Sequence, residues 1–228
     1  MRVETIRVAV PAWAAVIFAA LAALVMTPGE AAAAPPRALS IAEARALPLG
    51  TRVTLEGTVS TPSGAFASSF FDQGFGLQDR SAGIYVSIQT DLGLVPRERA
   101  RVTGTLTDSF GLLILAVDDE DDVESCGRGG PLVARHLATS AVSEATEGLL
   151  VTVKGSITRG PEDDLPYGYK FFVDDGSGEL TIFVNLQTEI DVAALAVGQR
   201  VTVAGFSSQF DDHYEIDPRS PADVRVVR

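Results

Sequence analysis

The stretch FGLQDRSAGIYVSI, residues 75–88, returns as FFVDDGSGELTIFV, residues 171–184. Shorter pairs flank it in the same order: TRVTLEG (51–57) with LLVTVKG (149–155), and RVTG (101–104) with TVAG (202–205). The spacing between partners stays near 100 residues and drifts only as loop insertions would allow. Each copy of roughly 90 to 95 residues has the size of a domain and exceeds a solenoid repeat. The sequence therefore predicts two tandem domains of one fold.

The repeated stretches alternate apolar and polar residues and are rich in Val, Ile, Thr and Phe, which predicts half-buried antiparallel strands. The alternation assigns two faces. We expect the core face to carry Phe75, Leu77, Ile84, Val86 and Ile88 in the first copy, and Phe171, Val173, Leu180, Ile182 and Val184 in the second. The opposite face then carries Gly76, Gln78, Tyr85, Ser87 and Gln89, and in the second copy Lys170, Phe172, Thr181, Phe183 and Asn185.

Helical signals are few and short. Ser40 and Glu43 have the spacing of a capping box, and Pro48 follows as a stop. Similar short turns or helices are expected at 139–147 and 189–195. Long loops are expected after the first strand of each copy, at 61–71 and 159–169, where they supply further aromatic side chains.

The segments SIAEARALPLGTRVTLEGTV, FGLQDRSAGIYV and GQRVTVAGF resemble exported bacterial tandem OB-fold proteins of the nucleic-acid-binding type. The resemblance implies an all-β chain with two five-stranded barrels, over residues 35–126 and 127–228. It also implies a ligand on the face of the second and third strands, where OB-folds bind oligonucleotides or oligosaccharides.

The N-terminal segment predicts export. Arg2 and Arg7 precede an uncharged apolar run at 8–26, and a Pro-Gly break and four alanines follow it. This order is typical of a secretory signal peptide, here residues 1–34, which places the protein in the periplasm, the cell envelope or outside the cell. An uncleaved membrane anchor is the alternative. After cleavage we expect no stable membrane span.

Charge and composition exclude several classes of ligand, metal site and catalytic site. The 30 acidic residues outnumber the 18 basic ones, for a net charge of −12, which argues against a general polyanion binder. One cysteine and two histidines cannot build a zinc finger or a disulfide scaffold. Acidic runs at 118–122 and 174–179 leave calcium as a weaker alternative to solvated charge and turn chemistry. We predict no metal, no cofactor and no catalytic constellation.

These observations predict a non-catalytic binding protein whose ligand is an oligomer, either single-stranded nucleic acid or oligosaccharide. The outward aromatic side chains would form a stacking platform for bases or sugar rings. The candidate ligand-binding residues are Lys170, Phe172, Phe183, Asn185, Tyr167, Tyr169 and Tyr85. The alternative is an acidic protein-interaction or structural module of the cell envelope, with the same aromatics docking an envelope protein partner.

Overall fold

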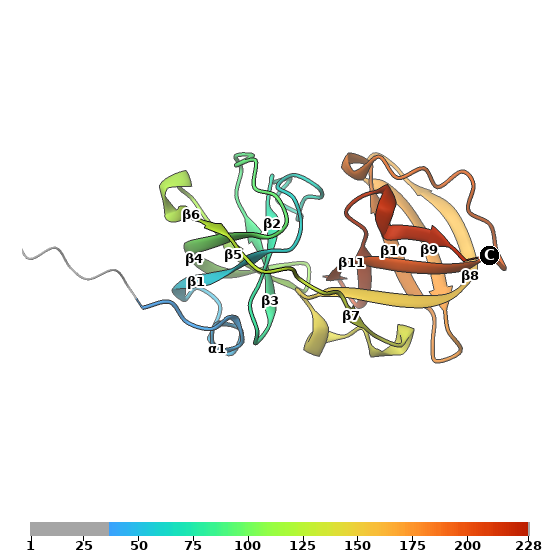
Figure 1. Cartoon of the computed structure of the whole chain (residues 1–228), viewed down its shortest axis with the longest axis horizontal. Helices are drawn as coiled ribbons and strands as arrows, with labels where there is room; N and C mark the ends of the chain where they lie inside the picture. Colours follow the sequence, from blue (N-terminus) through green and yellow to red (C-terminus); the bar gives the residue numbers. More distant parts are fainter. Residues whose placement is uncertain (1–36, 228) are drawn as a thin grey trace, which may run out of the picture. The chain divides into compact units, whose positions relative to one another are not determined.

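Two closed β-sheets make up most of the described chain (Figure 1). The computed structural model describes residues 37–227, so the predicted signal peptide lies outside the described residues. In this described part, no helix combines the length and the apolar character needed to cross a membrane.

The first sheet follows helix α1 (Ile41–Arg45). Its strands are β1 (Arg52–Val59), β2 (Phe75–Gln78), β3 (Gly83–Ser87), β4 (Glu98–Ser109), β5 (Leu112–Ala116) and β6 (Val123–Arg128), with the 3₁₀ turn η1 (Glu120–Asp122) before β6. Its strand order is β1-β2-β3-β5-β4, and β4 pairs back onto β1, which closes a five-stranded barrel; β6 is added beside β4.

The second sheet repeats this plan. Its strands are β7 (Arg135–His136), β8 (Leu150–Asp164), β9 (Gly168–Asp174), β10 (Leu180–Asn185), β11 (Arg200–Phe210), β12 (His213–Asp217) and β13 (Val224–Val226). The 3₁₀ turns are η2 (Thr139–Ala141), η3 (Glu144–Thr146), η4 (Leu186–Thr188) and η5 (Pro221–Asp223). The ring β8-β9-β10-β12-β11 closes by pairing of β11 with β8. In the first barrel β3 pairs in parallel with β5, and in the second β10 pairs in parallel with β12. The predicted tandem OB-folds are therefore confirmed.

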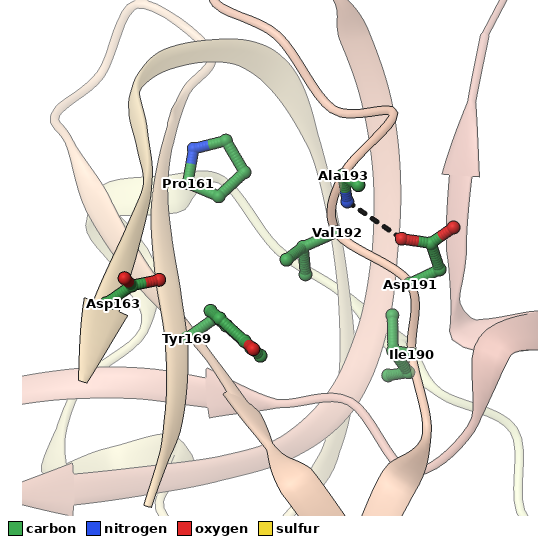
Figure 2. A pocket seen from close by; sticks show the side chains of 7 residues that line it. All are labelled: Pro161, Asp163, Tyr169, Ile190, Asp191, Val192 and Ala193. Carbon is green, nitrogen blue, oxygen red and sulfur yellow. Dashed lines mark hydrogen bonds between the residues drawn. The ribbon is translucent and has the colours of Figure 1, made fainter. Parts of the chain in front are cut away.

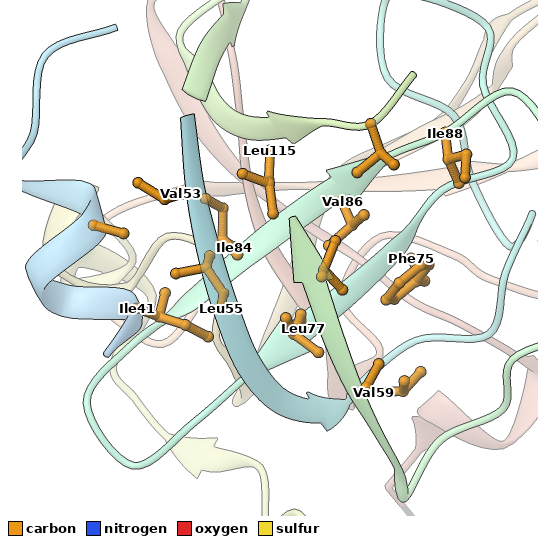
Figure 3. Close-up of a cluster of buried hydrophobic side chains, with 14 of the residues drawn as sticks. Ile41, Val53, Leu55, Val59, Phe75, Leu77, Ile84, Val86, Ile88 and Leu115 are labelled. Carbon is orange, nitrogen blue, oxygen red and sulfur yellow. The ribbon is translucent and has the colours of Figure 1, made fainter. Parts of the chain in front are cut away.

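Each barrel encloses its own apolar core, and the predicted core faces are correct. In the first barrel Phe75, Leu77, Ile84 and Val86 are each fully buried, and they form one core with Ile41 and Ala44 of α1 (Figure 3). The five residues predicted for the second copy lie in the second core, with exposed fractions of 4% or less. Alternation along the strands was a reliable guide because a closed barrel buries one face of every strand.

The segment 189–195, where a short turn or helix was expected, forms a turn in which the Leu195 amide donates to the Val192 carbonyl at 3.0 Å. One local prediction needs correction. The loop expected at 159–169 is instead a hairpin, in which β8 continues to Asp164 and β9 begins at Gly168. Register shifts on either side of Arg159 break the period-two pattern, so that part of the hairpin lacks the usual sequence signature of a strand.

Other local predictions are confirmed. Ser40 Oγ accepts a hydrogen bond from the Glu43 amide at 3.3 Å, and the Glu43 carboxylate accepts one from the Ser40 amide at 2.9 Å. This reciprocal pair is the predicted capping box at the start of α1. Turns η2 and η3 lie within the segment 139–147 where short helical turns were expected.

An Asp-x-Ser turn joins the second and third ring strands of each barrel. In the first barrel Asp79 accepts hydrogen bonds from the amides of Ser81 and Ala82, and also from the Ile41 amide of α1 at 2.9 Å. In the second barrel Asp175 accepts bonds from Ser177 and from Thr139 of η2. Both aspartates therefore tie their turn to the helical element that precedes the barrel. The pKa of Asp175 falls to about 2, first through its hydrogen bond with Ser177.

Replacing Asp79 with alanine should lower the free energy of unfolding by about 1 kcal/mol, as expected for loss of a side-chain cap. The α1 amide of Ile41 would lose its acceptor, and the turn would lose its internal bonds. Urea unfolding followed by circular dichroism measures the change. The control is Arg80→Ala, which removes the exposed neighbouring side chain; equal stability of the two variants would contradict the role given to Asp79.

The two barrels meet along an interface within this part of the chain. Gly83 and Gly148 approach so closely that a Cβ atom on Gly83 would overlap the Gly148 carbonyl. The Leu150 amide donates to Gln78 Oε1 at 2.9 Å, and the Arg219 guanidinium donates to the Ser60 carbonyl at 2.8 Å. A third apolar cluster lies at this interface and consists of Ala65, Phe66, Tyr85, Leu112 and Ile114 from the first barrel with Phe206 from the second.

Candidate ligand-binding groove

A groove of about 750 Å³ runs between the outer face of the second barrel and two loops of the first. One of these loops connects β1 to β2 and contributes Phe71. The other is the β4–β5 turn, which contributes Phe110. Strands β9 to β12 of the second barrel supply the opposite wall. Both barrels therefore build the groove, and neither contains it alone.

Two aromatic pairs connect the walls of the groove. Phe110 stacks on Phe210 with ring centroids 5.5 Å apart, and Phe71 lies 6.2 Å from Tyr167. Each pair takes one ring from each barrel. All four side chains are more than half exposed, from 51% for Phe210 to 69% for Phe71. Exposed rings in a concave site are available to a ligand in a way that core aromatics are not.

The backbone holds two of these rings in an uncommon conformation. Phe71 has a φ of 54° and Phe110 a φ of 51°, both in the left-handed region. Bulky residues rarely adopt this region, and residues held there cluster at ligand-binding sites. The Asp211 amide donates to the Phe110 carbonyl at 2.7 Å, which fastens the β4–β5 turn to the β11–β12 turn of the second barrel. The paired barrels thus hold the rings in place.

The strand register brings polar groups to the wall between the rings. Residues paired across neighbouring strands share a face, and Ser208 of β11 pairs with Glu215 of β12, which pairs in turn with Thr181 of β10. On β12, alternation places three titratable side chains toward the groove: His213, Glu215 and Asp217. The wall is therefore a polar surface bordered by aromatic rings.

The surroundings of Asp217 and His213 in this wall favour the protonated form of each. Burial raises the pKa of Asp217 well above its ordinary value of 3.8, and the neighbouring Glu215 raises it further. Glu215 also raises the pKa of His213, whose Nε2 lies 3.6 Å from a Glu215 carboxylate oxygen. Lys170 lies 3.6 Å from Asp164, so the lysine of this wall already has an anionic partner.

Tyr85 lies at the deep side of the groove. It is on the predicted outer face of β3, yet it is fully buried, because Phe206 of the second barrel and Phe66 pack against it. Its hydroxyl donates to Asp72 at 2.7 Å. Burial, followed by the nearby Asp72, raises the pKa of Tyr85 well above 10, so the hydroxyl keeps its proton and remains a donor.

Five of the seven candidate residues predicted from the sequence line the groove: Tyr85, Tyr167, Lys170, Phe183 and Asn185. The other two lie elsewhere. Phe172 shares the outer face of β9 but is only 9% exposed, because the Arg159 guanidinium lies over its ring at 3.6 Å. It therefore does not offer the open stacking surface that was expected.

Tyr169 belongs to a second, smaller pocket of about 500 Å³ (Figure 2). It is a strand residue and not a loop residue, and its side chain packs against the second core. Asp191 in this pocket accepts a hydrogen bond from the Ala193 amide at 2.9 Å, which is turn chemistry. This pocket is less suited to a ligand than the groove, because it lacks paired exposed rings.

Several residues of the groove were not among the sequence candidates: Phe71, Phe110, Phe210, Glu215 and Asp217. Two signals could have identified some of them. Phe110 and Phe210 occupy the equivalent hairpin turn in the two copies, and HYEID (213–217) alternates titratable with core residues. The position of Phe71 has no such signal, because it depends on how the first loop meets the second barrel.

Comparisons with known proteins give distant structural likenesses. No protein-family model matches the chain, and no curated protein matches it. Solved structures that resemble it include the tetrameric p202 HIN2, with 13% identity and a TM-score of 0.38 over 78% of this chain and 95% of that chain. A murine DNA-binding protein bound to double-stranded DNA shows 12% identity and a TM-score of 0.38, over 77% and 95%. Fission yeast Pot1 with single-stranded DNA shows 12% and 0.38, over 83% and 88%.

Proposed function

We propose that this chain is an exported, non-catalytic binding protein that holds an oligosaccharide in the groove between its two OB-fold barrels. The observation that carries the proposal is the pair of cross-barrel aromatic contacts, Phe71 with Tyr167 and Phe110 with Phe210. Sugar rings can lie flat on exposed aromatic faces, and two separated pairs suit a ligand of several rings. Export rests on the N-terminal sequence and belongs to the proposal.

The polar groups of the groove suit sugar hydroxyls. Asn185, Gln187 and Gln209 bring side-chain amides to the lining, and Ser208 and Thr181 bring hydroxyls. An amide offers both donors and acceptors, and a sugar hydroxyl needs both. A few polar groups placed among apolar rings are the usual composition of a small-molecule site.

The charges of the groove oppose a nucleic acid. Proteins bind a phosphate backbone by neutralising it with lysine and arginine. The lining contains Asp164, Glu215 and Asp217, and its basic side chains are Lys170 and His213. Both of these already lie beside carboxylates. Stacking alone would favour single-stranded nucleic acid as much as a glycan, so charge decides between the two ligands.

The test is a binding screen of glycan oligomers and of single-stranded DNA and RNA, with the double variant Phe71→Ala/Phe210→Ala. The variant removes one ring from each cross-barrel pair, and we expect it to weaken oligosaccharide binding by about tenfold or more. Both side chains are over half exposed, so the fold should keep its melting temperature. Isothermal titration calorimetry gives the affinities.

The matched control is Phe70→Ala. Phe70 is 50% exposed and adjoins Phe71, but it does not line the groove. Binding of nucleic acid with no glycan bound would overturn the proposal, and so would equal losses from the Phe70 and the double variants. Binding of neither ligand would favour the protein-interaction alternative.

A further inference from the structure

The groove contains a buried acid with one unpaired carboxyl oxygen. Asp217 lines it with only 4% of its surface exposed, and among the described residues its Oδ1 atom has no hydrogen-bond partner. Asp72, on the first-barrel side, is equally buried at 1% but accepts hydrogen bonds from Ser68, Tyr85 and Ser87. Asp217 accepts a hydrogen bond from the Ser208 side chain, so folding satisfies Asp72 but leaves one oxygen of Asp217 without a partner. An unsatisfied buried acceptor is costly unless a ligand or water completes it.

A second acid lies beside it. Glu215 follows Asp217 on the groove face of β12 and is 7% exposed. In the described part of the chain, His213 Nε2 lies 3.6 Å from a Glu215 carboxylate oxygen and is a cation only when protonated, while no lysine or arginine forms an ion pair with either acid. Two neighbouring acids without a strong cation favour keeping a proton between them, and a positively charged group that takes the place of this proton would favour the ionised form of both acids.

Aromatic side chains lie close to Asp217. Phe206 pairs across the strands with Asp217, and its ring packs on Tyr85 and Phe66. A cation is stabilised by aromatic faces as well as by carboxylates, and an ammonium group has three donors to share among acceptors. A metal ion fits less well, because no three His, Cys, Asp or Glu side chains of residues 37–227 converge on one point.

We infer that the oligosaccharide bound in the groove is an amino sugar, whose protonated amine lies against Asp217 and Glu215. This inference rests on the proposed function and specifies its ligand class. A hydroxyl could donate to one acceptor only, whereas an ammonium group can donate to both acids and also supplies the missing positive charge. An acetylated amine would bring a neutral amide with one donor and a bulkier group to the same place.

The experiment compares two oligomers of one length, an N-acetylglucosamine oligomer and its de-acetylated form, at a pH where the free amine is protonated. For the wild-type protein we expect the de-acetylated form to bind about tenfold more tightly. Glu215→Gln and Asp217→Asn should each remove most of this preference, because they keep side-chain volume but remove a carboxylate. Calorimetry measures the affinities, and a melting curve checks that each variant is folded.

The control for charge is Asp211→Asn, which changes net charge by the same amount on an exposed side chain that does not line the groove. It should keep the preference. Equal binding of the two oligomers would overturn the amino-sugar inference and leave the proposed function standing. Binding of neither oligomer would overturn both. A preference that Asp211→Asn reduces as much as Glu215→Gln does would also overturn the inference, since general charge would then explain it.

Discussion

Replacing Phe206 with alanine should lower the free energy of unfolding by about 3 to 5 kcal/mol, the range for truncating a buried phenylalanine. Phe206 belongs to the second barrel but is fully buried against the first, with ring centroids 5.4 Å from Phe66 and 6.0 Å from Tyr85. The surrounding strands are closed into barrels, so they cannot collapse into the cavity that the lost ring would leave. The loss should therefore lie near the upper part of the range.

Urea unfolding measures this change, and Phe210→Ala is its matched control. Phe210 lies on the same strand and the same face, but it is 51% exposed at the mouth of the groove. Its truncation should change stability by less than about 1 kcal/mol, as is usual for exposed positions. If Phe206→Ala were as mild as Phe210→Ala, the barrels would not be held together through this cluster.

The comparison of Tyr85 with Phe183 shows how far the sequence predicts the site. Alternation correctly placed both side chains on the outer faces of their barrels, because the pleat of a strand determines its faces. Tyr85 is nevertheless fully buried, whereas Phe183 lines the groove. The difference comes from docking of one barrel on the other. Period-two patterns carry no information on which outer face a second domain will cover.

The same reasoning explains why the fold was predictable and the groove only in part. The core faces, the capping box at Ser40 and the tandem barrels follow from local patterns and from the internal repeat. The groove depends on contacts between distant residues, such as Phe71 with Tyr167, which are 96 positions apart in the sequence. The Arg159–Phe172 contact is a further case, since a strand residue outside the repeated motif covers the ring expected to be open.

Replacing Arg45 with alanine should also lower stability by about 3 to 5 kcal/mol, because it leaves a buried carboxylate without its cation. Arg45 of α1 contacts Glu147 at 2.9 Å and Glu144 at 2.7 Å, which joins the first barrel's helix to the start of the second barrel. The Glu147 side chain is fully buried, and its Oε1 also accepts from the Leu113 amide. Arg52→Ala is the control, because its pair with Asp122 is largely exposed and should contribute less than about 1 kcal/mol.

The loss of stability caused by Arg45→Ala should increase with pH. Burial raises the pKa of Glu147 above its ordinary value of 4.5, while Arg45 opposes the rise. A carboxyl group whose pKa is raised in the folded state contributes to the free energy of unfolding at pH values below 4.5. This contribution is lost as the pH increases through the folded-state pKa. Without Arg45 that pKa rises further, so the difference between variant and wild type should be large at pH 7 and smaller near pH 4.5.

The double variant Arg45→Ala/Glu147→Gln separates charge from packing. Glutamine keeps the acceptor for the Leu113 amide but carries no charge to bury, so the double variant should be more stable than Arg45→Ala at pH 7. Near pH 4.5, where Glu147 is increasingly protonated, the two variants should converge. A defect of Arg45→Ala that is equal at both pH values and unchanged by Glu147→Gln would show that the arginine acts through its other contacts, such as its hydrogen bond to the Gly83 carbonyl of β3 at 3.2 Å. In that case the buried ion pair would contribute little to the junction of the barrels.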